Sequence, residues 1–168
     1  MRVEDVITPG NPGAFTVGDR SAADSLDHLA PVHRAMLDRP VTAVLATEKA
    51  NGRPQLTPVW CNTDGVHVQI NTARGRLKDR NLRSRPRASL LLLDPEDPYH
   101  WLMIEGDVAE TVDEDDADRG HEATTTIDDL AESYLGQRPY PLRAPEGEVR
   151  VLHRVLPTRI MTFGPAQG

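Results

Sequence analysis

The stretch RPQLTPVWCNTDGVHVQINTARGRLKDRNLRSRPR, residues 53–87, contains the strongest local signals of the fold. Residues 53–60 predict a strand, and Asp64-Gly65 predicts a turn. Apolar and polar side chains alternate over residues 66–71, which is typical of a strand with one face in the core and one in water. Residues 75–83 predict a short amphipathic helix. The stretch therefore predicts strand, turn, strand and helix.

The helix at the end of this stretch is basic in an acidic chain. Seven Lys or Arg residues lie within residues 74–87 against one acid, whereas the whole chain has a net charge of −7. Proteins hold anions with basic side chains and with free N–H groups at a helix start, and glycine lets the backbone approach closely. Arg74, Gly75, Arg76 and Lys78 offer all three features. We predict a phosphate site here; the alternative is a basic face exposed to water, as in most charge runs.

The flanking segments extend this pattern into an α+β chain. Further strands are predicted at residues 42–47, 88–93, 99–104, 107–112, 148–156 and 158–163, with a hairpin turn at Asn51-Gly52 and a bend at Glu105-Gly106. Helices are predicted at residues 24–37, broken or begun at Pro31, and at 113–135, ended by Gly136. We predict a six- to eight-stranded antiparallel sheet, closed into a small barrel with flanking helices.

Length and composition restrict the class of protein. The 168 residues suit one domain, predicted at residues 24–168 after an extension at residues 1–23 that is rich in Pro, Gly, Asp and Ser. No apolar run approaches the roughly 20 residues of a membrane span, and no signal peptide is evident. Cys61 is the only cysteine, so we expect a cytoplasmic protein. The negative charge disfavours nucleic-acid binding.

Two other groups of residues are candidates for a ligand site. Pro58 cannot donate to a sheet ladder, so we expect a break within residues 57–60 that frees backbone groups; an edge strand without a ligand is the alternative. Trp60 is either a platform for a ring or part of the core. Tyr99, His100 and Trp101 form an aromatic cluster in a chain with 4% aromatic residues, and planar ligands bind beside such side chains.

The histidines and the cysteine give weaker signals. His121-Glu122 lacks the second histidine of the H-E-x-x-H metal motif, so no metal site is predicted. His121 and His153 each stand alone in apolar surroundings and are expected in the core. Cys61 has no C-x-x-C partner and is expected to be unreactive.

Three motifs together resemble one family. They are LATxxxxGRPQLTPVW at residues 45–60, NTARGRLKDRNLRSRPRASL at 71–90, and WLMIEG at 101–106. They resemble the pyridoxamine 5′-phosphate oxidase-like split β-barrels, and more narrowly their actinobacterial deazaflavin branch, the coenzyme F420-dependent oxidoreductases of the "B" type. DLAESYLGQRPYP at residues 129–141 is similar to the same branch. The resemblance covers about residues 41–164 and leaves out the N-terminal extension.

The resemblance implies a homodimer with two cofactor sites at the subunit interface, and hydride transfer between the deazaflavin and a planar or conjugated small molecule. It implies that Arg76, Lys78 and Asn81 hold the cofactor phosphate. It places Thr57, Pro58, Val59 and Trp60 against the ring, and Tyr99, His100 and Trp101 over the site from the partner subunit. Gln55, Asn71, Arg74 and Gly75 lie in the same motifs and complete the predicted cofactor-binding set; the segment around Tyr140 approaches the substrate pocket.

Other cofactors remain open at this point. FMN would present a phosphate to the same basic pair. A true pyridoxamine phosphate oxidase would need a second basic set, and the arginines of the C-terminal third are scattered: Arg138, Arg143, Arg150, Arg154 and Arg159. A non-catalytic cofactor carrier or a haem-binding barrel is the alternative of another class, with His100 or His121 as the axial ligand. No catalytic side chain is evident. His100 and a water molecule are the candidates for the group that protonates the product.

Overall fold

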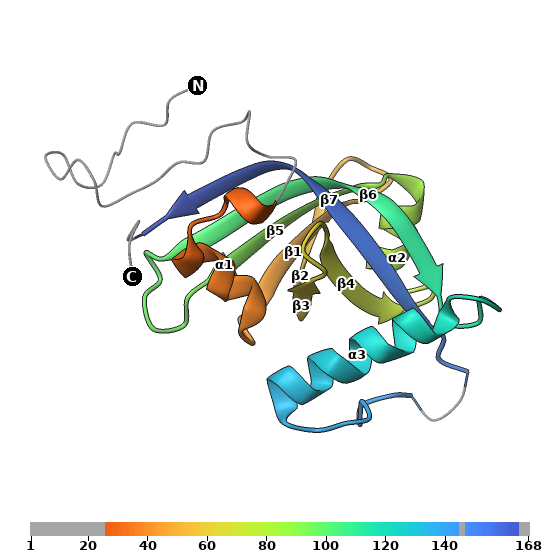
Figure 1. Cartoon of the computed structure of the whole chain (residues 1–168). Coiled ribbons are helices and arrows are strands. Elements are labelled where there is room, and N and C mark those ends of the chain that lie inside the picture. Colours follow the sequence, from red (N-terminus) through yellow and green to blue (C-terminus); the bar gives the residue numbers. More distant parts are fainter. Residues whose placement is uncertain (1–25, 145–146, 165–168) are drawn as a thin grey trace, which may run out of the picture.

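Seven strands form one strongly curved antiparallel sheet in the computed structural model, which describes residues 26–144 and 147–164 (Figure 1). The strands are β1 (Ala43–Glu48), β2 (Pro54–Val59), β3 (Cys61–Thr63), β4 (Val68–Ala73), β5 (Arg87–Leu93), β6 (Trp101–Asp113) and β7 (Arg150–Phe163). Their order across the sheet is β2-β1-β5-β6-β7-β4-β3. The predicted extension at residues 1–23 lies outside the described residues.

The first and last strands of this order are neighbours in the chain. β2 pairs with β1 and β3 pairs with β4, and the single residue Trp60 joins β2 to β3. No ladder joins β2 to β3 themselves, so the sheet does not close completely, and the antiparallel split β-barrel that the resemblance implies is confirmed. The chain changes partner at Trp60 and not at Pro58. Pro58 is exposed and stays in register with Val44 on an edge strand, where a missing N–H is tolerated.

β6 and β7 are each a single long strand, where two pairs of shorter strands were predicted. The register of the two strands shifts between Glu105 and Gly106, so the predicted bend is confirmed. A Cβ at Gly106 would lie 2.4 Å from the carbonyl oxygen of Leu156, and only glycine permits this approach. Pro157 pairs opposite Gly106 at this irregularity and does not end β7. Long-range pairing therefore carries both strands through residues that locally favour a break.

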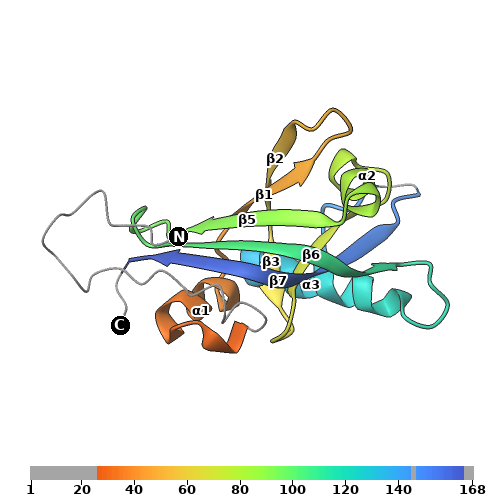
Figure 2. The same ribbon diagram turned by 90° about the horizontal axis from the view of Figure 1, so that it is seen from above.

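Three α-helices flank the sheet within the described residues, α1 (Pro31–Asp38), α2 (Leu77–Ser84) and α3 (Gly120–Leu135), and a short 3₁₀ helix (Leu26–His28) precedes α1. Proline at the first position of α1 and left-handed Gly136 after α3 confirm two predicted boundaries. The predicted start of α3 at residue 113 is wrong, because β6 continues to Asp113 and a turn follows. α3 packs on β4, β6 and β7, α2 packs on β1 and β4, and α1 packs on β3 and β6 (Figures 1 and 2).

The core fills the inside of the curved sheet and extends under the helices. Leu45, Ile70, Leu90 and Ile104 are fully buried in one cluster with residues of α1 and α2. The polar face of β4 is not exposed to water as predicted, since α3 covers it. Gln69 is buried there, and Asn71 Nδ2 donates to the carbonyl oxygen of Ala123 on α3 at 2.7 Å. No described helix has the length and apolar character that crossing a membrane requires.

Several predicted inward-facing side chains need correction. Leu82 of α2 is buried as expected, but Leu77 is 40% exposed because it lies at the first position of α2. His121 is exposed on α3, whereas His153 is buried as predicted. Cys61 is buried, and burial raises the pKa of its thiol to about 12, so the prediction of an unreactive cysteine is confirmed.

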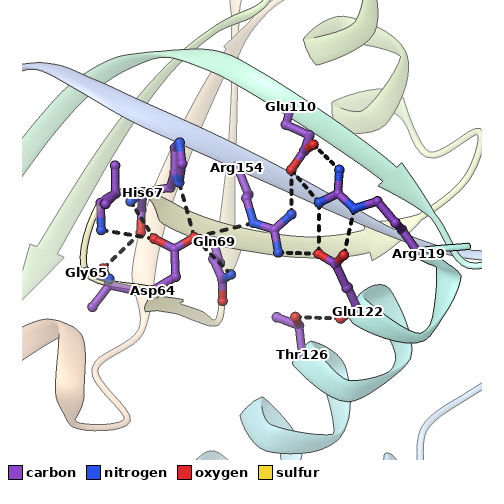
Figure 3. Close-up of polar contacts among 11 residues, drawn as sticks. Asp64, Gly65, His67, Gln69, Glu110, Arg119, Glu122, Thr126 and Arg154 are labelled. Carbon is purple, nitrogen blue, oxygen red and sulfur yellow. Dashed lines mark hydrogen bonds and ion pairs between the residues drawn. The ribbon is translucent and has the colours of Figure 1, made fainter.

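A charged network fixes α3 to the sheet (Figure 3). Glu122 on α3 and Glu110 on β6 both accept hydrogen bonds from Arg119 and from Arg154 of β7. Arg154 Nε also lies 3.4 Å from Asp64 in the β3–β4 turn. Hydrogen bonds from Arg119, then from Arg154, lower the pKa of each glutamate to about 2. The network therefore holds α3 at a fixed place over β4, β6 and β7.

Candidate functional site

A cavity of about 390 Å³ lies where β2, β4, α2 and α3 meet. Within the range typical of small-molecule sites, this is a modest volume. Residues from several separate stretches of the chain line it: Thr42, Pro58, Val59, Trp60, Asn71, Thr72, Arg76, Lys78, Ile127, Leu130, Tyr140, Leu142 and Arg150. Its wall therefore combines apolar and aromatic side chains with three cations.

Three cations line the polar side of this cavity. Arg76 is the N-cap residue of α2, Lys78 lies in the first turn of α2, and Arg150 begins β7. Lys78 is half-buried, and burial, followed by the charges of Arg76 and Arg150, lowers its pKa. Among the described residues, no acid pairs with its ammonium group. The cavity therefore carries a concentrated positive charge that a bound anion would stabilise.

Arg150 is the best-held of the three cations. Its side chain is 2% exposed, its Nε donates to Asn71 Oδ1 at 2.9 Å, and its Nη1 donates to Glu148 Oε1 at 2.7 Å. Its guanidinium carbon lies 5.1 Å from the centre of the Tyr140 ring, in a cation–π arrangement. Glu148 Oε2 is also 3.4 Å from Arg76 Nη2. Arg150 is thus immobilised by contacts from β4 and from the segment that precedes β7.

Trp60 forms the aromatic wall. Its ring stacks on Tyr134 of α3 with centroids 5.1 Å apart, and Tyr140 meets it edge-on at 6.1 Å. Tyr134 Oη donates to the carbonyl oxygen of Val41 at 2.6 Å, which fixes its ring. Trp60 is only half-buried and it lines the cavity. Trp60 therefore belongs partly to the core and partly to the wall of the cavity, the two alternatives that the sequence left open.

Two buried hydroxyls lack a partner within the part of the chain that the structure describes. They are Thr57 Oγ1 on β2 and Thr72 Oγ1 on β4. Thr72 lines the cavity and is 1% exposed. An unpaired buried hydroxyl is costly, and such groups commonly find their partner in a ligand or water. Thr72 therefore gives the cavity a polar group beside the cations.

Asp79 stabilises the loop that presents Arg76 and Lys78. Gly75 has φ +77°, and its N–H donates to Asp79 Oδ2 at 2.8 Å. Arg83 Nε and His153 Nε2 contact Asp79 Oδ1 at 2.8 and 3.2 Å. Burial raises the pKa of this carboxyl, but the hydrogen bonds from His153, Gly75 and Arg83 outweigh burial and hold the pKa at about 2. Asp79 is therefore a buried anion that orders the start of α2.

Most of the other basic side chains of residues 74–87 are paired outside the cavity. Arg74 pairs with Asp113 and Asp115, Arg83 with Asp113, and Arg85 and Arg87 with Glu48. Arg80 donates to the carbonyl oxygen of Gly75 at 2.6 Å. The water-exposed alternative thus describes most of the basic run, and only Arg76 and Lys78 line the cavity.

The structure brings six of the predicted site residues to the cavity: Pro58, Val59, Trp60, Asn71, Arg76 and Lys78. Gln55 and Asn81 meet each other beside it, where Asn81 Nδ2 donates to Gln55 Oε1 at 3.1 Å and to Thr47 Oγ1 at 3.0 Å. Asn81 is 5% exposed and does not line the cavity. Thr57, Arg74 and Gly75 also lie outside its lining.

Tyr99, His100 and Trp101 lie in and after the β5–β6 loop, at the end of β6 away from α3 (Figure 1). None of the three lines the cavity of the same chain. Trp101 stacks on Phe163 at 5.6 Å, and His100 is 5% exposed with its Nδ1 3.1 Å from Asp94 Oδ2. A place for this cluster at the site of a partner subunit stays a prediction. No described group of three or more His, Cys, Asp or Glu residues could hold a metal ion.

Sequence reasoning missed Arg150 and Glu148. In the sequence Arg150 is one of several scattered arginines, but β4 and β7 pair so that Ala73 faces Arg150 and Thr72 faces Val151. No local pattern reveals this pairing. The segment around Tyr140 was predicted to approach the substrate pocket, and Tyr140 and Leu142 do line the cavity.

A split β-barrel whose cavity is lined by cations at the start of a helix is suited to an anionic ligand. Residues 29–151 match the pyridoxamine 5′-phosphate oxidase family, and the chain belongs to this family. The match spans the whole lining of the cavity.

Solved structures with the same fold have varied functions. An F420 reductase is 27% identical over 76% of this chain and 94% of its own, with a TM-score of 0.63. A conserved hypothetical protein from Mycobacterium tuberculosis is 22% identical over 90% of this chain and 87% of its own, with a TM-score of 0.62. The haem storage protein HutZ from Vibrio cholerae is 19% identical over 81% of this chain and 96% of its own, with a TM-score of 0.58. The last two show the fold alone.

Proposed function

We propose that this protein is an oxidoreductase that binds the deazaflavin coenzyme F420 and transfers a hydride between it and a planar or conjugated small molecule. The observation that carries the proposal is the half-buried ammonium of Lys78, which faces the cavity beside Arg76 and Arg150 without an acidic partner among the described residues. A phosphate is the anion that best matches such a cluster of Lys and Arg. The similarity to an F420 reductase and the family match support the choice of cofactor.

The residues of the cavity fit such a cofactor. The lining combines three cations with the apolar and aromatic side chains around Trp60, so a phosphate and a ring can both be accommodated. Thr72 adds a buried hydroxyl without a partner in the described chain. When bound, the deazaflavin supplies the hydride chemistry. The protein binds the phosphate, orients the ring against the wall around Trp60 and excludes water.

FMN is the second candidate, because it presents a phosphate to the same pair of residues. Titration of the protein with F420 and with FMN, followed by absorption and fluorescence, separates the two. We expect binding of F420 at micromolar concentration. The absence of such binding would exclude the proposed cofactor, and binding of FMN alone would assign the protein to the flavin-dependent members. A haem titration tests the remaining alternative, in which His100 would be the axial ligand: its Nδ1 contacts Asp94, and its buried Nε2 has no partner in the described chain.

Lys78→Ala tests whether the cavity holds the phosphate. We expect cofactor binding to weaken by about 1.5–3 kcal/mol, the scale of a hydrogen bond to a charged group. The matched control is Lys49→Ala, because Lys49 is the only other lysine and lies in the β1–β2 turn away from the cavity. Equal dissociation constants for the wild type and Lys78→Ala would show that Lys78 only faces water.

A further inference from the structure

The carboxylate of Glu148 lies between two of the three cavity cations. One oxygen accepts a hydrogen bond from Arg150 Nη1 at 2.7 Å, and the other lies 3.4 Å from Arg76 Nη2. The Glu148 side chain is 6% exposed, although its residue belongs to the irregular segment before β7. A nearly buried carboxylate thus occupies guanidinium groups at the place where an anionic ligand is proposed to bind.

The two arginine contacts of Glu148 are unequal. Arg150 is 2% exposed and is also held by Asn71 and Tyr140, so it cannot readily leave Glu148. The Arg76 side chain is 51% exposed and its contact with Glu148 is longer. A hydrogen bond of 2.7 Å between charged groups is strong, whereas contacts near 3.4 Å are weak. If one of the two pairs opens, it is therefore the pair of Glu148 with Arg76.

We propose that Glu148 is an internal counter-ion that competes with the ligand's phosphate group for Arg76. In the free protein Glu148 neutralises part of the positive charge of the cavity. When a phosphate binds, Arg76 turns from Glu148 to the phosphate, Lys78 provides the second cation, and Arg150 retains Glu148. The carboxylate lowers the affinity for phosphate twice, because its pair with Arg76 must open and because like charges repel in a partly dry cavity. This inference rests on the proposed function for the identity of the ligand.

An opposite role for Glu148 would also agree with the distances. Glu148 could hold Arg76 and Arg150 in the orientation that a phosphate needs, as a positioning residue. The two roles predict opposite changes in phosphate affinity when Glu148 is replaced. Removal of a competing counter-ion strengthens phosphate binding, whereas removal of a positioning residue weakens it.

Glu148→Gln decides between them, because glutamine keeps an oxygen that accepts from Arg150 and removes only the charge. We measure binding of inorganic phosphate by calorimetry at low ionic strength, and binding of F420 and FMN by fluorescence. We expect the dissociation constant of phosphate to fall about tenfold, and likewise that of whichever cofactor binds. A tenfold change equals about 1.4 kcal/mol of binding free energy. The control is Glu48→Gln. Glu48 also lies between two arginines, at 3.7 Å from Arg85 and 3.5 Å from Arg87, but outside the cavity, so affinities should change less than twofold.

Unchanged or weaker binding of phosphate by Glu148→Gln overturns the proposal, and so does an equal increase in Glu48→Gln. If Glu148→Gln does not fold, Glu148→Asp replaces it, since the shorter side chain can keep Arg150 but not reach Arg76. Its phosphate binding should strengthen about twofold to threefold, and no gain counts against the proposal. A wild-type protein that binds phosphate but neither F420 nor FMN would refute the proposed function and still allow the phosphate comparison to decide the role of Glu148. Undetectable phosphate binding in all variants overturns the inference.

Discussion

Side chains that line the cavity have fewer hydrogen bonds to water than side chains of the same type at the surface, because they are partly buried. Lys78 shows this most clearly. Arg83 of the same helix pairs with acids outside the cavity, whereas the pKa of Lys78 is lowered by burial first and then by the charges of Arg76 and Arg150. The opposite charge of an anion in the cavity would raise this pKa again. The residue that is least stabilised in the free protein is therefore the one expected to gain most from a ligand.

The hydroxyl of Thr72 gives a prediction at this scale. Thr72→Val keeps the shape of the side chain and removes a buried hydroxyl that has no partner in the described chain. We expect the free energy of unfolding of the ligand-free protein to rise by about 1 kcal/mol, because the unpaired group no longer has to be buried. Cofactor affinity should fall by about fivefold to tenfold, since a hydrogen bond to the ligand is lost. Urea unfolding and cofactor titration measure the two effects.

Thr126→Val is the matched control for this prediction. Thr126 is also buried, but its Oγ1 donates to the carbonyl oxygen of Glu122 at 2.7 Å, so the substitution should not stabilise the protein. Loss of stability in Thr72→Val would show that its hydroxyl already has a partner. A gain of stability with unchanged cofactor affinity would show that the ligand does not use it.

At the scale of elements, α3 connects the charged network with the cavity. One end of α3 carries Glu122, which accepts from Arg119 and Arg154 (Figure 3), and later turns supply Ile127 and Leu130 to the cavity wall. The network is built from β6, β7 and α3, which contact one another only in the folded protein. The stability of this network depends on the negative charges of Glu110 and Glu122.

The pH dependence of unfolding tests this network. The folded pKa of Glu110 and of Glu122 is about 2, below the ordinary value of about 4.3. Because the folded pKa is depressed, the stabilisation is complete above about pH 4.3 and is lost as the pH falls through about 2. At pH 7, Glu122→Gln should lower the free energy of unfolding by about 1 kcal/mol, the upper range for pairs that remain partly in water. The difference from wild type should shrink towards pH 2.

Urea unfolding at pH 7, 4 and 2.5 measures this difference. Glu132→Gln is the control, because Glu132 lies on the same helix, is 64% exposed and pairs at 3.3 Å with Arg138 only. It should change the free energy of unfolding by a few tenths of a kcal/mol at every pH. A constant difference between wild type and Glu122→Gln across the pH range would mean that the network does not stabilise α3 through charge.

The elements that could be predicted from sequence are those with local causes. The turn at Asn51-Gly52, the start of α1 at Pro31 and the end of α3 at Gly136 depend on residues at the boundary itself, and they agree with the structure. The full length of β6 and β7 could not be predicted, because pairing between distant segments overrides the local signals at Gly106 and Pro157. The start of α3 was misplaced for the same reason.

The residues of the site also fall into two groups, those with a local sequence signal and those that only strand pairing brings together. Arg76, Lys78 and the segment around Trp60 lie in one continuous stretch, residues 53–87, where local patterns indicate them. Arg150 contacts Asn71 across 79 positions of the sequence, and only the pairing of β4 with β7 brings the two together. Asn81 follows the phosphate motif in sequence, but in the structure it supports β1 and β2 through Thr47 and Gln55.

At the scale of the whole molecule, the surface offers features suited to a second subunit. The edge strand β2 carries Leu56, which is 64% exposed, and the β5–β6 loop carries Tyr99, which is 62% exposed. Exposed apolar side chains and an open sheet edge are commonly covered by partners. The aromatic cluster of residues 99–101 does not line the cavity of its own chain. Both observations support the proposal of a homodimer in which the cluster closes the partner's site.

Subunit complementation tests this arrangement. Lys78→Ala damages the cavity and Tyr99→Ala damages the loop, and Tyr99 is exposed enough for its replacement to leave the fold intact. We expect each variant alone to bind the cofactor at least tenfold more weakly than wild type. Unfolding and refolding an equal mixture makes about half of the dimers mixed, and each mixed dimer has one undamaged cavity facing one undamaged loop. About a quarter of the sites should then bind with wild-type affinity. If each site is formed by one chain, or if the protein is monomeric, no such sites appear in the mixture.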